Sequence, residues 1–293
     1  MCNIFLTGAS GFVGASLLNY FKADSIQISS RGKEYIFHGA KKIIHLAGKA
    51  HDLKRTSNTN EYYKVNTELT KKLFDVFLAS SADVFITLSS VKAVADEVNG
   101  SLTEEFIPAP ITHYGKSKLL AEQYILSKEI PEGKRVYILR PCMIHGPGNK
   151  GNLNLLYQLV SKGIPWPLGA FENYRSYCSI DNLMFIIKEL IEREDIPSGV
   201  YNIADDEALS TNEVISVLAQ SKNRTPKILK VSKGLIQFIA KTGNLFRLPL
   251  NEERLQKLTD SYVVSNQKIV NAIGKQLPVS SKEGLLLTFK SFS

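Results

Sequence analysis

Hydrophobic residues along this 293-residue chain alternate between short runs typical of buried strands and stripes at helical spacing. The first run, residues 3–7 (NIFLT), is followed by Val13, Leu17, Leu18 and Phe21 on one face of a helix. Further strands are predicted over residues 25–29, 42–48, 83–88, 136–141 and 200–203, and further helices over 62–79, 114–127, 155–160 and 183–191. This alternation, which continues to about residue 205, predicts an α/β fold built on a doubly wound parallel sheet.

A glycine-rich turn, residues 8–14 (GASGFVG), lies between the first predicted strand and the first predicted helix. Glycines at such a turn let the backbone approach a pyrophosphate, whose charge then lies at the helix N-terminus among free N–H groups. A tight turn that needs glycine only for its backbone angles is the plainer alternative. The strand before the turn and the helix after it favour a dinucleotide site.

The end of the second predicted strand bears on which dinucleotide would bind. A site specific for NAD usually carries an acidic residue there, which holds the ribose 2′-hydroxyl, but this chain has Ser30 and Arg31. A guanidinium suits a 2′-phosphate, although an exposed arginine in a loop is also common. The sequence therefore favours NADP(H) as the cofactor and leaves NAD(H) open.

The segment 114–118 (YGKSK) places a phenol and an ammonium one helical turn apart. Tyr114 and Lys118 are separated by four residues, so both side chains lie on one face of the predicted helix. A free phenol has a pKa near ~10, and a neighbouring ammonium is expected to lower it, so that the pair could exchange a proton at neutral pH. A solvated helix face is the commoner meaning of this spacing. The pair Ser89 and Ser90 supports a reactive site, because it ends a predicted buried strand where open parallel sheets bind ligands.

Charge is distributed unevenly along the chain. The net charge is +8, and residues 206–293 contain 13 basic and 7 acidic residues, which gives +6 for this part. Such a basic part suits a polyanionic partner, an acidic lipid surface or a phosphorylated substrate, or it is an ordinary solvated surface. No block of Lys and Arg is interleaved with aromatic residues, so nucleic acid is not expected as a partner.

Cysteine usage and hydropathy argue against further classes of protein. The three cysteines are odd in number and lack metal-ligand spacing, so neither a disulfide framework nor a metal site is expected. No apolar run approaches ~18 residues, and the N-terminus leads directly into a strand. Residues 235–250 are apolar enough to touch a membrane, but Lys241, Gly243, Arg247 and Pro249 interrupt them. We expect a cytoplasmic protein without stable membrane insertion.

Five motifs follow one another along the chain at spacings that agree with the predicted strands and helices: residues 7–14 (TGASGFVG), 45–48 (HLAG), 89–90 (SS), 114–118 (YGKSK) and 138–148 (ILRPCMIHGPG). In these motifs the chain resembles the extended short-chain dehydrogenases/reductases, and among them the NAD-dependent nucleotide-sugar epimerases, dehydratases and reductases. The resemblance implies a Rossmann-type dinucleotide-binding domain of residues 1–165, to which residues 177–205 return. Residues 166–176 and 206–293 would form a smaller C-terminal α/β lobe that binds the nucleotide sugar.

The resemblance also implies roles for individual residues. Tyr114 would be the catalytic acid/base, and Lys118 would lower its pKa and bind the nicotinamide ribose. Ser90, in preference to Ser89, would hydrogen-bond the reacting C4 oxygen. The cofactor would contact the two glycine-containing turns and the end of the second strand, at Thr7, Gly8, Ser10, Gly11, Phe12, Val13, Arg31, Leu46, Ala47 and Gly48. The substrate diphosphate would be held by Arg175, Asn152 and Arg254.

Residues 89–93 (SSVKA) and 167–176 (PLGAFENYRS) are most similar to bacterial enzymes of surface-polysaccharide synthesis. Those enzymes reduce a UDP-4-keto-6-deoxy-N-acetylhexosamine or epimerise a UDP-hexose at C4. A reductase releases oxidised cofactor at each turnover and suits NADPH, so Arg31 favours a reductase over an epimerase with tightly bound NAD. A dehydratase would need an Asp-Glu pair where this chain has Val91 and Lys92. A cofactor-sensing protein without catalysis is a third alternative, and the presence of both Tyr114 and Lys118 argues against it.

Finally, the resemblance implies a homodimer. In relatives, helices that correspond to residues 68–79 and 114–127 build a four-helix interface between two subunits. The apolar stripes of these helices could equally face the sheet within one subunit.

Overall fold

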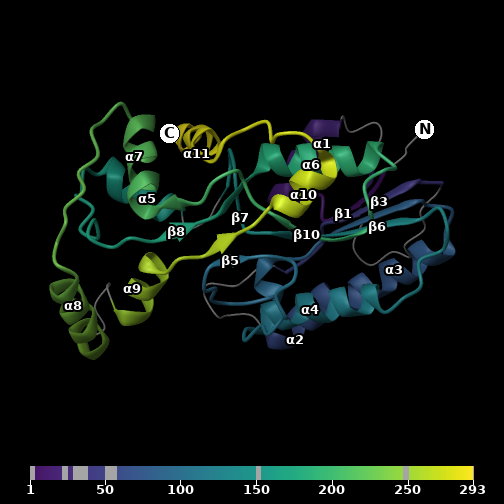
Figure 1. Cartoon of the computed structure of the whole chain (residues 1–293), viewed down its shortest axis with the longest axis horizontal. Coiled ribbons are helices and arrows are strands. Elements are labelled where there is room, and N and C mark those ends of the chain that lie inside the picture. The colour runs from purple at the N-terminus through teal and green to yellow at the C-terminus, as the bar shows by residue number, and fades with distance from the viewer. Residues whose placement is uncertain are drawn as a thin grey trace.

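A computed structural model describes residues 4–21, 26–28, 39–49, 58–149, 153–246 and 251–292, without the side chains of residues 155, 243–246, 253, 254 and 257. One end of the molecule contains a sheet with helices on both faces, and the other end contains helices and short strands (Figure 1). The active-site candidates from the sequence lie mainly along the edge where the strands of the sheet end.

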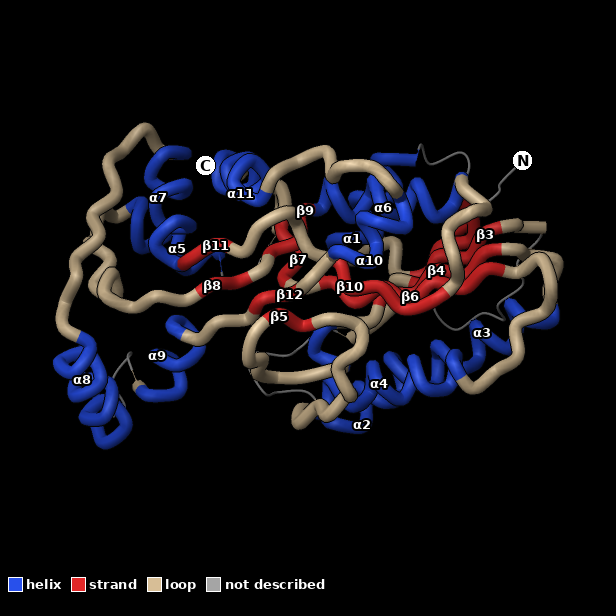
Figure 2. The backbone as a smooth tube through the Cα atoms, viewed as in Figure 1, coloured by secondary structure: helices blue, strands red, loops and turns tan. Residues whose placement is uncertain are grey.

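The central sheet has six strands, and all neighbouring strands are parallel. Their order is β10-β6-β4-β3-β1-β2, with the bounds β1 Ile4–Thr7, β2 Ile26–Ile28, β3 Lys42–His45, β4 Val84–Leu88, β6 Arg135–Pro141 and β10 Gly199–Ile203. Figure 2 labels β10, β6, β4 and β3 of this sheet. The chain runs from β1 outward to β2 and then crosses to the other side of β1, so the strand order reverses between β1 and β3. Sheets of this kind bind ligands at that reversal, outside the carboxyl ends of the strands. The predicted doubly wound parallel sheet is confirmed.

Helices cover both faces of the sheet (Figure 1). One face carries α1 (Phe12–Phe21), α6 (Ile180–Glu192) and α10 (Gln267–Ile273), and the other carries α2 (Thr59–Tyr62), the π-helix η2 (Tyr63–Glu68), α3 (Leu69–Ala79) and α4 (His113–Leu126). The helix predicted over residues 62–79 is present, and its residues 63–68 form a π-helix. A π-helix bonds each residue to the fifth one along, and short π segments occur frequently at functional sites.

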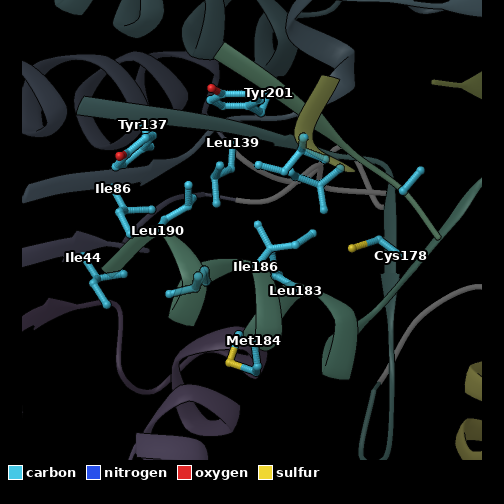
Figure 3. Packing of buried hydrophobic residues seen from close by; sticks show 14 of the residues in the cluster. Ile44, Ile86, Tyr137, Leu139, Cys178, Leu183, Met184, Ile186, Leu190 and Tyr201 are labelled. Carbon is cyan, nitrogen blue, oxygen red and sulfur yellow. The ribbon is translucent and has the colours of Figure 1, made fainter. Parts of the chain in front are cut away.

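The core consists of two apolar layers, one on each face of the sheet. Ile44 and Ile86 point toward α6, where they share a buried cluster with Leu190 (Figure 3). Their chain neighbours Ile43 and Phe85 point the opposite way, into the layer beneath α3 and α4. Successive strand residues face opposite sides of a sheet, so a sheet covered on both faces has continuous apolar strands without polar alternation.

The end of the molecule away from the sheet has its own apolar clusters, one among α5, α7 and α11 and another around Trp166, α8 and α9. Two of these helices, α7 and α11, begin with a capping box, formed by Ser210 with Glu213 and by Ser280 with Glu283.

The remaining helices are α5 Leu153–Ser161, α7 Thr211–Ser221, α8 Lys233–Phe246, α9 Glu252–Thr259, α11 Ser281–Lys290 and the 3-10 helix η3 Val91–Ala93. The remaining strands form three pairs: β5 Ser101–Leu102 with β12 Val263–Val264, β7 Met143–His145 with β9 Tyr177–Ser179, and β8 Tyr174–Arg175 with β11 Leu209–Ser210.

A buried carboxylate joins the two ends of the molecule. Asp205, which follows β10 closely, accepts hydrogen bonds from the backbone N–H of Ser179 (2.8 Å to Oδ1) and from Nδ2 of Asn182 (2.7 Å). Its Oδ2 lies 3.4 Å from Nε2 of His145, whose Nδ1 is 2.9 Å from Oγ1 of Thr288 in α11. Strands β7 and β9 and helices α6 and α11 therefore meet at one carboxylate.

The described residues contain neither a candidate metal cluster nor a candidate membrane-spanning helix. No group of three or more His, Cys, Asp or Glu in this part of the chain could hold a metal ion. Among the helices described, none is both long and apolar enough to cross a membrane.

Candidate active site

The glycine turn after β1 packs directly against the turn after β3. Gly8 has a φ of +77°, and a Cβ at this position would lie 2.5 Å from the backbone nitrogen of Ala47. A Cβ on Gly14 would lie 2.2 Å from the carbonyl oxygen of Gly8, which also accepts a hydrogen bond from the Gly11 N–H (3.0 Å). The partly exposed start of α1 thus lies where the strand order reverses. A close-packed glycine turn at the start of a helix fits the pyrophosphate of a dinucleotide.

A chain of buried hydrogen bonds connects this turn to the helical layer beneath the sheet. The Ala47 N–H donates to Oγ1 of Thr7 (3.2 Å), and Oγ1 of Thr7 lies 2.7 Å from Nδ1 of His45. On the other side, Nε2 of His45 lies 2.9 Å from Oγ1 of Thr70, which donates its own hydrogen to the carbonyl of Asn66 (2.7 Å). Since the Thr70 hydroxyl donates its hydrogen to Asn66, Nε2 of His45 must donate to Thr70, and Nδ1 must accept from Thr7.

His45 is neutral in this position. Burial, with a smaller effect from the charge of Lys118, lowers the pKa of His45 to about 3. A neutral imidazole with one donor and one acceptor nitrogen satisfies both threonines, whereas an imidazolium would leave Thr7 without its acceptor.

The amide of Asn66, on the π-helix, links three segments of the site. Its Oδ1 accepts from the Lys49 N–H (2.7 Å), and its Nδ2 donates to the Lys49 carbonyl (3.1 Å) and to Oγ of Ser117 (3.0 Å). Ser117 in turn donates to the carbonyl of Tyr114 (2.8 Å). The turn after β3 and the start of α4 are therefore held by one fully buried side chain.

Tyr114 lies at the start of α4, where the Thr112 side chain caps the helix by accepting from the Gly115 N–H (3.2 Å). Burial raises the pKa of Tyr114, and a hydrogen bond with Ser90 opposes this effect. Oγ of Ser90 already accepts from the Lys92 N–H (3.2 Å), so its own hydrogen is available to the phenol oxygen. The structure brings Ser90, and not Ser89, beside Tyr114.

Lys118 lies one turn further along α4, as the spacing predicted. Its Nζ donates to the carbonyl of Leu88 at the end of β4 (2.7 Å), and a Cβ on Gly48 would lie 3.0 Å from the same Nζ. Burial lowers the pKa of Lys118 to about 8, against a raising effect of Glu122. The sequence led us to expect that Lys118 lowers the pKa of Tyr114. In the structure the pKa of Tyr114 is raised, because the effect of burial is larger than the lowering effect of the hydrogen bond with Ser90.

Ser89 belongs to a buried ionic cluster instead. Its hydroxyl donates to the Glu122 carboxylate, which forms a two-pronged ion pair with Arg140, through Nε to Oε1 (3.0 Å) and through Nη2 to Oε2. All three side chains are buried. Adjacent residues of an extended segment point to opposite sides. Ser89 therefore holds the end of β4 in the ionic cluster, while Ser90 faces the phenol of Tyr114.

Lys92 and Arg175 bring positive charge to the same region. Nζ of Lys92 donates to the Asp96 carbonyl (2.8 Å) and lies 4.1 Å from the centre of the Tyr262 ring. Burial lowers the pKa of Lys92, with a smaller lowering effect from the charge of Arg175. Arg175 itself donates from Nε to the carbonyl of Asp260 (2.9 Å). The expected diphosphate ligand Arg175 is therefore electrostatically coupled to a lysine two residues after Ser90.

The structure gathers most of the residues singled out in the sequence at one edge of the sheet. Thr7 through Val13, Leu46 through Gly48, Ser90, Tyr114 and Lys118 lie at or near the carboxyl ends of β1, β3 and β4. Arg31, Asn152 and the side chain of Arg254 lie outside the described residues. Sequence reasoning missed Asn66, Lys92 as a cation of the site, and Tyr262, because only the folded chain brings them there.

A dinucleotide turn lies at the switch point, Ser90 follows β4, and Tyr114 and Lys118 lie on α4. This combination defines an oxidoreductase of the short-chain type. Residues 29–204 match the NAD dependent epimerase/dehydratase family. The chain belongs to this family, and the family and enzyme class predicted from the sequence are confirmed.

Three curated relatives show the range of activities in the family. A UDP-glucose 4-epimerase of Vibrio cholerae is 29% identical over 99% of this chain and 95% of its own length. An N-acetyl-alpha-D-glucosaminyl-diphospho-ditrans,octacis-undecaprenol 4-epimerase of Escherichia coli O157:H7 is 28% identical over 76% of this chain and 73% of its own. A GDP-6-deoxy-D-mannose reductase of Pseudomonas aeruginosa is 25% identical over 74% of this chain and 79% of its own.

Solved structures share the fold across the whole chain. MoeE5 in complex with UDP-glucuronic acid and NAD superposes with a TM-score of 0.74 at 18% identity, covering 99% of this chain and 98% of its own. RMD from Pseudomonas aeruginosa, complexed with NADPH, has a TM-score of 0.72 at 21% identity and covers 100% of both chains. These likenesses support the Rossmann-type architecture.

We predict that His45 makes stability depend on pH. Its pKa is about 3 in the folded chain and 6.5 in an unfolded one, so the unfolded state binds more protons between these values. The free energy of unfolding should fall as pH drops below about 6.5, by up to about 1.4 kcal/mol per pH unit from this group. Urea unfolding at several pH values should show a weaker dependence in His45→Gln, while the exposed control His113→Gln keeps it. An unchanged dependence in His45→Gln would contradict the neutral imidazole.

We also predict that Gly115 is required for the geometry of the site. A Cβ there would lie 2.2 Å from the Lys92 carbonyl oxygen, so Gly115→Ala must push η3 and α4 apart and separate Ser90 from Tyr114. Turnover should fall by about 10²-fold and stability by about 1–3 kcal/mol. The matched control is Gly234→Ala in α8, where a Cβ would meet nothing within 4 Å. It should leave turnover unchanged, and equal losses in both variants would refute the steric explanation.

Proposed function

We propose that the chain is an NAD(P)-dependent oxidoreductase that acts at C4 of a UDP-linked hexose. Its reaction would be the reduction of a UDP-4-keto-6-deoxy-N-acetylhexosamine in surface-polysaccharide synthesis. The observation that carries this proposal is the hydrogen bond between Ser90 and Tyr114, with Lys118 one turn further along the same helix and bonded to the end of β4. Family membership and the reductase among the relatives support it.

In this proposal Tyr114 gives its proton to the C4 oxygen. Burial raises its pKa, so the phenol holds the proton at neutral pH, as a proton donor must. Ser90 donates to the same oxygen, and a positioned donor of this kind is worth about 3 kcal/mol. A nicotinamide bound beyond the glycine turn would supply the hydride. Lys118, held by the Leu88 carbonyl, would bind the ribose and place positive charge beside the developing alkoxide.

The substrate diphosphate would bind on the side of Arg175, with Lys92 as a second cation. Asn152 and Arg254 remain predicted ligands of the same diphosphate. The division into a dinucleotide-binding domain (1–165 with 177–205) and a substrate lobe (166–176 with 206–293) likewise stays a proposal. The basic excess of the C-terminal part would supply binding energy for the remote diphosphate.

A second candidate is 4-epimerisation, in which NAD stays bound and the same two side chains move the proton out and back. Two of the relatives are 4-epimerases, one of UDP-glucose and one of a hexosamine on a polyprenyl diphosphate. The preference for NADP(H) over NAD(H), which separates the reductase from the epimerase, rests on Arg31 alone.

An assay with a substrate for each reaction distinguishes the reductase from the 4-epimerase. The protein is incubated with UDP-4-keto-6-deoxy-GlcNAc and NADPH or NADH, and separately with UDP-glucose or UDP-GlcNAc, while reduced cofactor and sugar products are followed. We expect stoichiometric loss of NADPH with the keto sugar. Inversion at C4 without net redox would select the epimerase. Absence of both, in protein shown to bind the cofactor, would select the cofactor-sensing alternative.

The two adjacent serines should respond differently to substitution. Ser90→Ala should lower kcat by about 10²–10³-fold, because it removes a donor to the reacting oxygen. It also removes the acceptor of the Lys92 N–H, so the free energy of unfolding should fall by about 0.5–1 kcal/mol. Ser89→Ala removes a partner of the buried Glu122–Arg140 pair and should lower the free energy of unfolding by about 1–3 kcal/mol, with a smaller effect on kcat. The reverse pattern would show that Ser89 faces the substrate.

A homodimer through α3 and α4 also remains a proposal, as does a cytoplasmic location. These two helices pack against each other, and Leu120 and Leu126 on α4 are 43% and 59% exposed. Apolar side chains exposed on a helix pair are suited to a second copy of the same pair. Sedimentation equilibrium should give a dimer, and Leu120→Arg should give a monomer. A wild-type monomer would exclude this interface.

A further inference from the structure

Helix α8 exposes a row of large apolar side chains at the edge of the molecule. Leu235, Phe238 and Ile239 are 52%, 65% and 39% exposed. Their spacing of i, i+3 and i+4 places them on one face of the helix. Figure 2 shows α8 at the periphery, beyond α9 and far from the central sheet.

The fold does not need this row for its own packing. The neighbouring face of α8 carries Ile236 and Ala240, which are 4% and 0% exposed and pack in a cluster with Trp166, Leu168 and Leu255. The helix is therefore anchored by one apolar face while a second is left to solvent. Single exposed apolar residues are common on protein surfaces, whereas a contiguous apolar patch marks an interaction site.

The charge around α8 indicates the partner. From residue 214 to residue 251 the sequence contains seven Lys and Arg and no Asp or Glu. Lys227, Lys230, Lys233 and Lys241 are all exposed. Acidic residues return only at Glu252 and Glu253 in α9. A dense cluster of basic residues on and beside an amphipathic helix is typical of binding to anionic lipid head groups.

We propose that α8 docks the protein on an anionic lipid bilayer. Leu235, Phe238 and Ile239 enter the boundary between head groups and acyl chains, and the surrounding lysines bind the anionic head groups. An amphipathic helix of this kind lies in the plane of the interface at a depth of about 5–10 Å. Such docking requires no membrane-spanning helix, and the described residues contain none.

The docking face adjoins the proposed substrate lobe. Phe238 and Lys241 also line a groove of about 500 Å³ between α8 and α9, which Asp260 lines as well. The carbonyl of Asp260 accepts the hydrogen bond from Arg175 (2.9 Å). A bilayer at α8 would thus lie beside the groove that borders the proposed diphosphate ligand, although the docking itself does not depend on the proposed reaction.

Co-sedimentation of the full chain with lipid vesicles tests the proposal without any measurement of turnover. We expect binding to vesicles of phosphatidylglycerol and phosphatidylethanolamine, weaker binding at higher salt, and little binding to phosphatidylcholine alone. Leu235→Ser/Phe238→Ser should weaken binding by at least about tenfold. Lys230→Glu/Lys233→Glu should weaken it most at low salt.

The matched control is Ile107→Ser/Ile111→Ser, which removes two side chains that are 89% and 75% exposed elsewhere on the surface. It should bind vesicles like the wild type, and circular dichroism melting should show that all variants are folded. No binding of the wild type to anionic vesicles would overturn the proposal, as would unchanged binding of Leu235→Ser/Phe238→Ser. A change of oligomeric state in that variant without vesicle binding by the wild type would assign the patch to a second copy of the chain.

Discussion

The close contact between the turns that end β1 and β3 is the constraint on which the site depends. Gly8 approaches Ala47 so closely that no side chain fits between them, and the buried chain from Thr7 through His45 to Thr70 fixes the same two strands from below. This chain continues into the π-helix, whose Asn66 holds Ser117 on α4. The turn suited to a pyrophosphate and the helix that carries Tyr114 are thus parts of one connected polar network. A neutral imidazole is essential to it, because the network needs one donor and one acceptor nitrogen.

The end of β4 provides the second half of the site. Its carbonyl at Leu88 holds the Lys118 ammonium, and the two serines that follow point in opposite directions. Ser89 joins the Glu122–Arg140 pair, in which each buried charge compensates the other, while Ser90 faces Tyr114. Removal of one partner from such a pair leaves an uncompensated buried charge, so the cluster fixes the geometry of the strand end more than it adds stability.

The sequence was sufficient for the sheet, the glycine turn and the placement of Tyr114 with Lys118, because these features depend on local periodicity and on residues close in the chain. It did not reveal the π-helix at residues 63–68, since this six-residue segment differs from an α-helix only in bonding each N–H to the carbonyl five residues back instead of four. It also assigned the lowering of the Tyr114 pKa to Lys118 rather than to Ser90. The effect of burial and the approach of Tyr262 to Lys92, 170 residues away, arise only when distant segments meet. Arg31 and Asn152 lie outside the described residues and stay predictions.

The central claim is that the Tyr114 phenol, hydrogen-bonded to Ser90, transfers the proton at C4. Tyr114→Phe tests it most directly, with kcat/KM for NADPH oxidation by UDP-4-keto-6-deoxy-GlcNAc measured alongside NADPH binding and thermal melting. We expect kcat/KM to fall by about 10²–10⁴-fold while binding and melting stay at wild-type values. Turnover that persists near the wild-type rate in a folded, cofactor-binding Tyr114→Phe protein would contradict it.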